Sequence, residues 1–148
     1  MKSIRKILFV MVVPAAVFGF VACSDDDDGS SVVAVYEYKE TWTAEDGTTE
    51  CSDTYTAFFY NDGTFIVTSV GNDDEESWNY IEWTGTYTGD PSKDGTIKMT
   101  VTKMAGWDDD GNAKLVDVPE ASKELYTDMP IPIRDGTATI FAWEFTKK

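Results

Sequence analysis

The stretch Tyr60-Asn61-Asp62-Gly63-Thr64-Phe65 contains the clearest hairpin signal in this chain. It separates two runs, 50–60 and 64–70, that are rich in Thr, Tyr, Phe, Ile and Val, the residues that favour β-strands. An Asp-Gly pair between two such runs indicates a β-hairpin, because glycine readily adopts the positive φ angles of a tight turn. The two runs are therefore predicted to pair as neighbouring antiparallel strands.

The tripeptide Asp-Gly-Thr occurs four times and divides the chain into strand-length pieces. Its unequal spacing argues against a sequence repeat, and so against a propeller or a solenoid. Four hairpin signals in a chain of this length predict a mostly antiparallel meander. The copies begin at Asp46, Asp62, Asp94 and Asp135.

The pieces between these turns have the composition of strands, and none has the length and period of a long amphipathic helix. A meander must protect its edge strands, and closing into a barrel removes them. The predicted fold is all-β, a small antiparallel up-and-down β-barrel, and a two-sheet β-sandwich is the alternative. Further strands are expected at 32–43, 78–88, 96–104, 131–133 and 138–146, with a short strand near 115–118 and a helical turn at 120–126.

The N-terminal 22 residues have the composition of a secretory signal. Three basic residues precede an apolar run, 7–22, that is shorter than the roughly 20 residues of a membrane-spanning helix. The sequence Phe20-Val21-Ala22-Cys23 resembles the lipobox of bacterial lipoproteins, in which the cysteine receives diacylglycerol and becomes the new N-terminus. The resemblance implies lipid attachment at Cys23. A cut after Gly19, a retained anchor and an incidental cysteine are the alternatives.

Four aspartates follow this cysteine, and the stretch resembles the export signal of surface lipoproteins of the Bacteroidota type. The resemblance implies an outer-membrane lipoprotein exposed on the cell surface. The expected organisation is a lipoprotein signal peptide at 1–22, a lipidated acidic tether at 23–31 and a β-barrel domain at 32–148.

The mature chain is strongly acidic. The signal holds three of the 12 basic residues and none of the 27 acidic ones, so residues 23–148 carry a net charge of −18. This charge argues against nucleic acid as a partner and against lying flat on an anionic membrane. Solubility explains the acidity most simply, and capture of cationic ligands or divalent metal is the alternative. Aromatic residues make up 14% of the chain, which argues against disorder.

Enzymatic motifs are absent from the sequence. Without histidine there is no Ser-His or Cys-His dyad and no His-containing metal site, so neither catalytic residues nor a cofactor are expected. Asp108, Asp110 and Asn112 have the alternate spacing of calcium-loop ligands, but Ala113 occupies the glycine position of such a loop, so a solvated hairpin is favoured. Cys51 is expected to be a small buried side chain.

Three short motifs resemble bacterial lipocalin-like domains. They are the hairpin 60–65, the strand Trp83-Thr84-Gly85-Thr86-Tyr87 and the strand 94–100 with its Gly-Thr-Ile start. The resemblance implies a small calycin-type barrel with a ligand-sized cavity.

Aromatic residues in the expected strand 78–88 are the candidate ligand-binding residues. Trp78, Tyr80 and Trp83 can stack on sugars or line an apolar cavity, although a role in the core is the simpler interpretation for each. Strand alternation predicts that Trp78 and Trp83 lie on opposite faces, so one of them should be exposed or at a rim.

Two hypotheses about function follow. The first is a lipid-anchored extracellular lipocalin-like binding module for a small apolar or glycan-derived ligand. The second is a structural or interaction protein, such as an accessory subunit of a surface complex or an inhibitor of a host enzyme. An interior cavity of several hundred cubic ångströms would favour the first, and an interior filled by side chains with an apolar patch outside would favour the second.

Overall fold

The computed structural model describes residues 29–73, 76–110 and 112–148. The expected signal peptide, Cys23 and most of the acidic tether lie outside the described residues. Within the described residues, no helix has both the length and the apolar character needed to span a bilayer.

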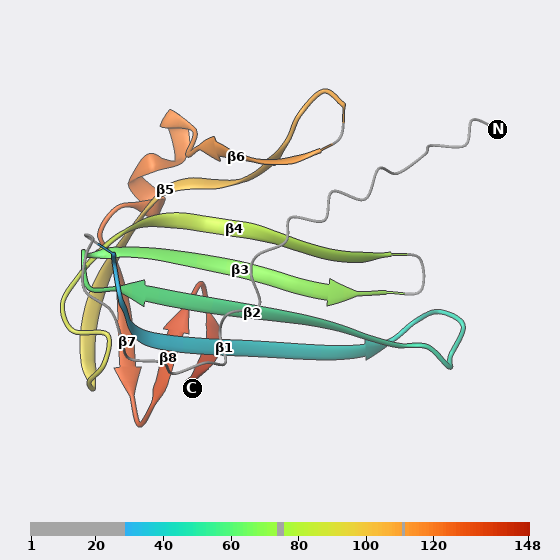
Figure 1. The fold of residues 1–148 in the computed structure, drawn as a ribbon, viewed down its shortest axis with the longest axis horizontal. Helices are drawn as coiled ribbons and strands as arrows, with labels where there is room; N and C mark the ends of the chain where they lie inside the picture. The colour runs from blue at the N-terminus through green and yellow to red at the C-terminus, as the bar shows by residue number, and fades with distance from the viewer. Residues whose placement is uncertain (1–28, 74–75, 111) are drawn as a thin grey trace.

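Nine strands form one antiparallel sheet in the order β4-β3-β2-β1-β9-β8-β7-β5-β6, and β4 also pairs with β5 (Figure 1). This last pairing closes eight strands into a barrel and leaves β6 outside the ring, so the predicted antiparallel barrel is confirmed. The elements are β1 (Val32–Thr43), β2 (Glu50–Tyr60), β3 (Thr64–Asn72), β4 (Ser77–Thr88), β5 (Gly95–Trp107), β6 (Ala113–Asp117), the 3-10 helix η1 (Glu120–Tyr126), β7 (Met129–Arg134), β8 (Thr137–Ile140) and β9 (Trp143–Lys147).

Each of the four Asp-Gly-Thr copies connects two paired strands, as predicted. Between β2 and β3, Gly63 has a φ of 82°, and the Asp62 carboxylate accepts hydrogen bonds from the backbone N–H and the hydroxyl of Thr64 at 2.9 and 2.6 Å. Between β7 and β8, Asp135 and Gly136 both have positive φ, which is typical of a two-residue type I′ turn. Local turn chemistry therefore sets these connections.

In a strict up-and-down barrel every strand would pair with the next one along the chain, and this rule fails between β6 and β7. Strand β5 has 13 residues, enough for its first part, 95–99, to pair with β7 and its last part, 103–107, to pair with β6. Helix η1 lies between β6 and β7 in the chain, and β7 rather than β6 continues the ring. The expected strand at 138–146 is divided into β8 and β9 by Phe141 and Ala142, which both have positive φ.

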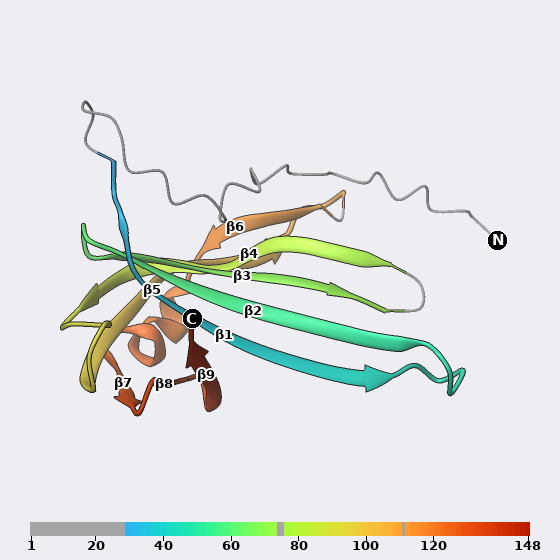
Figure 2. The ribbon, with the colours of Figure 1, turned by 60° about the horizontal axis from the view of Figure 1, so that its bottom comes forward.

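The barrel has a closed half and an open half. Strand β1 pairs with β9 only at Tyr36 and Glu37, and the pairing of β4 with β5 begins at Trp83. Strands β1 to β4 continue past these points as a four-stranded sheet that extends well beyond β7 and β8, as Figures 1 and 2 show. The inner face of this open half is continuous with the lining of the closed half.

Side chains fill the interior of the closed half. Alternate residues of β2, β3 and β5 point inward, and Ile97, Met99 and Val101 of β5 are among them. The largest of the fully buried residues in the core are Tyr36, Phe59, Phe65, Phe145, Ile97 and Met99.

Candidate functional site

A β-bulge in β4 determines which side chains face the interior of the open half. On the neighbouring strand β3, Val67 lies opposite Trp83 and the next residue, Thr68, lies opposite Ile81. Glu82 is therefore an extra residue in β4. A bulge of this kind shifts the alternation of all later side chains in the strand by one position.

The bulge brings Trp78 and Tyr80 onto the same face as Trp83. The indole of Trp78 covers Gly71, where an added Cβ would lie 2.4 Å from the ring, and its Nε1 donates a hydrogen bond to Asp53 at 3.4 Å. The prediction that Trp78 and Trp83 lie on opposite faces is wrong, because strict alternation fails across the extra residue. All three candidate ligand-binding residues lie on the inner face.

Five aromatic rings meet where the closed half passes into the open half. The rings of Tyr38 and Trp143 stack with 5.4 Å between their centroids, and Tyr55 lies 4.9 Å from Trp143 and 6.4 Å from Trp83. Phe141 lies 4.6 Å from Trp83 and completes the group, which we call the aromatic platform. Every member packs against the core and remains partly exposed. Of the five, only Trp83 was a candidate from the sequence.

Three carboxylates lie near Tyr55 of the platform, and we call them the acidic cluster: Glu40 of β1, Asp53 of β2 and Glu82 of β4. Burial, a hydrogen bond with Asp53 and the charges of all three carboxylates raise the pKa of Tyr55. The Tyr38 hydroxyl donates to Glu40 at 3.1 Å. Asp53 is only 7% exposed. The charges of three carboxylates from three different strands therefore act on Tyr55, and two of them, Glu40 and Asp53, lie opposite each other in the pairing of β1 with β2.

Ser69 lies beneath this cluster. It pairs with Tyr55 on one side and Tyr80 on the other, and it is 0% exposed. Its hydroxyl makes no hydrogen bond of good geometry with any described residue. Burial and the charge of Asp53 raise the pKa of Glu82, and the nearby Ser69 hydroxyl opposes this rise.

No described lysine or arginine forms an ion pair with the acidic cluster. The ion pairs of the described segments join residues elsewhere on the molecule: Lys93 with Asp90, Lys103 with Asp117, Lys123 with Glu120 and Lys148 with Glu37. The cluster therefore adds unneutralised negative charge to a partly buried aromatic surface.

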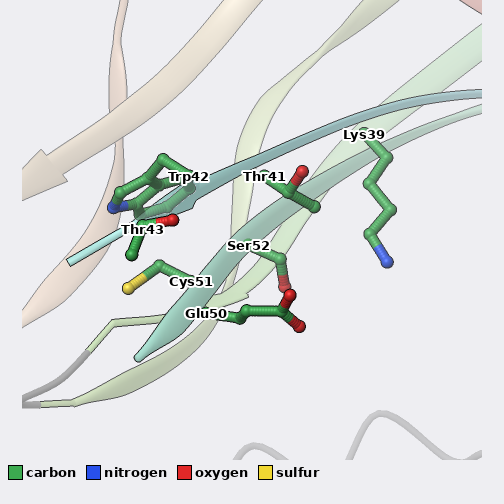
Figure 3. A pocket seen from close by; sticks show the side chains of 7 residues that line it. All are labelled: Lys39, Thr41, Trp42, Thr43, Glu50, Cys51 and Ser52. Carbon is green, nitrogen blue, oxygen red and sulfur yellow. The ribbon is translucent and has the colours of Figure 1, made fainter. Parts of the chain in front are cut away.

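A surface hollow of about 320 Å³ lies at the far end of the β1–β2 hairpin, outside the barrel core (Figure 3). Lys39, Trp42, Glu50 and Ser52 are among its lining residues, and Trp42 is 40% exposed. Cys51 also contributes to the lining and is 1% exposed, so it has the buried position expected from the sequence. The hollow is separate from the interior cavity that the lipocalin resemblance implies.

Hydrogen bonds between its own polar groups hold the loop between β5 and β6. The Asp108 carboxylate accepts hydrogen bonds from the backbone N–H groups of Asp110 and Asn112 at 3.0 and 2.8 Å, and these bonds lower its pKa. Such bonds are typical of a side chain that caps a turn. Across residues 29–73, 76–110 and 112–148, no three acidic or cysteine side chains are arranged to hold a metal ion.

Comparison with protein-family models, with curated proteins and with solved structures finds no match for this chain.

Proposed function

We propose that this protein is a lipid-anchored extracellular binding module whose small ligand lies on the aromatic platform. Cys23 would carry the lipid, placing the barrel on the outer surface of the outer membrane. The observation that carries the binding proposal is a continuous surface of five partly exposed aromatic rings, drawn from β1, β2, β4 and the β8–β9 turn region.

Aromatic rings of this kind suit a ligand with a flat apolar face. A partly exposed platform leaves apolar area in contact with water, and covering that area with a ring or a sugar face is favourable by about 25 cal/mol per Å². The proposed position differs from the expected interior cavity. Because side chains such as Phe59 and Met99 fill the closed half, we place the ligand at the mouth of the barrel.

The filled interior also supports the second hypothesis, an interaction protein. In that case a partner protein would cover the platform, and Trp42 and Trp107, which are 40% and 64% exposed, would extend the contact. The two hypotheses differ in the size of the bound molecule, so the mass of whatever is bound to the purified protein distinguishes them.

Native mass spectrometry of the protein purified from its own cell envelope tests the proposal. We expect a bound small molecule on the wild-type protein, loss of that molecule from Trp83→Leu, and retention by Phe58→Leu. Phe58 is a suitable control because it lies next to the inward-facing Phe59 on the opposite face of β2. A wild-type protein without a small molecule, or a small molecule retained by Trp83→Leu, would contradict the proposal.

Labelling with radioactive palmitate tests the anchor separately. We expect the label on the wild-type protein and not on Cys23→Ala, which should also leave the membrane fraction. Equal labelling of the two would contradict lipid attachment at Cys23.

A further inference from the structure

We propose that the ligand of the aromatic platform carries a protonated or quaternary amine, and that this amine lies against Asp53 and Glu82. This inference rests on the proposed function and specifies the chemical class of the ligand. Four features of the open half support it: the position of the carboxylates, their lack of a cationic partner, the buried hydroxyl of Ser69 and the neighbouring ring faces.

Strand register places two of the carboxylates beside the platform: Glu40 lies opposite Asp53, two residues along from the pair of Tyr38 and Tyr55. Asp53 and Tyr55 are neighbours on the inner face of β2, and Glu82 reaches the same region from the bulge of β4. The charges of Asp53, Glu82 and Glu40 all act on Tyr55, and the hydroxyl of the neighbouring Tyr38 donates to Glu40 at 3.1 Å. An ammonium group placed beside Tyr55 would therefore meet several carboxylates together.

The cluster lacks a cation of its own among the described residues. Burying a carboxylate is unfavourable unless it is paired, and two like charges close together add to this penalty. Asp53 is 7% exposed, and the indole Nε1 of Trp78 donates to it over a long 3.4 Å. A bound cation would relieve both the burial and the repulsion between Asp53 and Glu82.

The buried hydroxyl of Ser69 is a second observation that points to a missing polar partner at this site. Buried hydroxyl groups nearly always have a hydrogen-bond partner, and the few exceptions need a specific reason. The Ser69 hydroxyl is fully buried on the inner face, near Glu82 and Tyr80, yet it makes no hydrogen bond of good geometry with either of them or with any other described residue. An amine drawing Glu82 toward itself would rearrange the polar groups around this hydroxyl.

The neighbouring aromatic rings favour a cation over a neutral or anionic ligand. The face of an aromatic ring attracts a cation within about 6 Å, and the attraction increases when water is excluded. Tyr55 and Trp83 offer such faces next to the acidic cluster. A neutral sugar would gain only the stacking interaction, and an anion would be repelled by the carboxylates and by the acidic chain as a whole.

A matched pair of compounds tests the inference on the purified protein. The two compounds 2-phenylethylamine and 2-phenylethanol have similar size and an identical ring. The first carries an ammonium group at neutral pH, and the second carries a hydroxyl group in its place. We expect isothermal titration calorimetry at low salt to show at least tenfold tighter binding of the amine, which corresponds to about 1.4 kcal/mol. The preference should fall with increasing salt because charge attraction is screened.

Two substitutions test whether the carboxylates of the acidic cluster cause the preference for the amine. Glu82→Gln should remove most of the preference for the amine, and Asp53→Asn should do the same if it folds. Glu124→Gln removes an equal charge from the exposed surface of η1 and should leave the preference unchanged.

The outcomes separate this inference from the proposed function. Equal binding of the two compounds, or a preference that survives Glu82→Gln, would overturn the amine inference. Failure of both compounds to bind would overturn it as well. A small molecule seen by native mass spectrometry and lost from Trp83→Leu would still support the proposed function in each of these cases.

Discussion

Replacing Gly85 with alanine tests how β4 and β5 close the barrel. Gly85 lies in β4 opposite Val101 of β5, immediately beside an irregularity in the register of the two strands. An added Cβ would point into the barrel, where it would lie 1.9 Å from the backbone oxygen of Thr100 and 2.9 Å from Cε1 of Phe65. A glycine at such a point is typical of a tight bend or a close approach of two backbones.

We expect Gly85→Ala to destabilise the protein strongly, because the atom nearest to the added Cβ is a backbone atom. Phe65 could rotate slightly, but the Thr100 carbonyl can move only if β5 shifts, and an ordinary contact distance requires a shift of more than about 1 Å. Overpacking a core usually costs about 1–3 kcal/mol and occasionally more. For this rigid contact we expect a loss of about 3 kcal/mol or more, a large part of the 5–15 kcal/mol typical of a domain.

Urea denaturation followed by tryptophan fluorescence and by far-ultraviolet circular dichroism measures this change. Thr86→Ala is the control, because Thr86 is exposed and lies on the opposite face of β4. We expect Gly85→Ala to unfold at much lower urea concentration than Thr86→Ala, or to fail to fold. A free energy of unfolding within about 1 kcal/mol of wild type would refute the argument that the barrel seam requires glycine.

Two further predictions concern buried polar groups. Burial and the charge of Asp53 raise the pKa of Glu82, so between the unfolded and folded pKa values the folded protein binds more protons, and stability falls as the pH rises through this window. Glu82→Gln should therefore be more stable than wild type in urea denaturation at pH 7, with a difference that disappears below about pH 4; a less stable variant at pH 7 would contradict this. The hydroxyl of the fully buried Tyr36 donates to the Pro91 carbonyl at 2.6 Å, so Tyr36→Phe should lower the free energy of unfolding by about 1–3 kcal/mol, and an unchanged midpoint would show that this bond contributes nothing.

Much of the fold could be predicted because hairpins are local. The expected bounds of β1 and β2 agree with the structure, and the helical turn at 120–126 is present as η1. In each case the signal lies within a few residues, as in the capping of the Asp62 turn by its own carboxylate. The pairing of β7 with β5 was not predictable in this way, because it joins strands separated by a second hairpin and a helix.

The candidate site was predicted only in part. Trp78, Tyr80 and Trp83 were recognised as aromatic residues able to bind a ligand, but their common face was missed. Phe141 and Trp143 joined the site from the other end of the chain, and no sequence signal connected them to Trp83. The extra residue at Glu82 could be recognised only by comparing β4 with its neighbour β3.

Turn propensity and charge are properties of residues and their immediate neighbours, so the antiparallel hairpins and the strong acidity of residues 23–148 could both be read directly from the amino-acid sequence. The folded chain was needed to show which strands close the ring, that Trp78 and Trp83 share one face, and that Glu40 lies opposite Asp53. These features depend on strand register and on the bulge in β4. Register relates residues of strands that can be distant in the sequence, and one extra residue in a strand moves all of its later side chains to the opposite face.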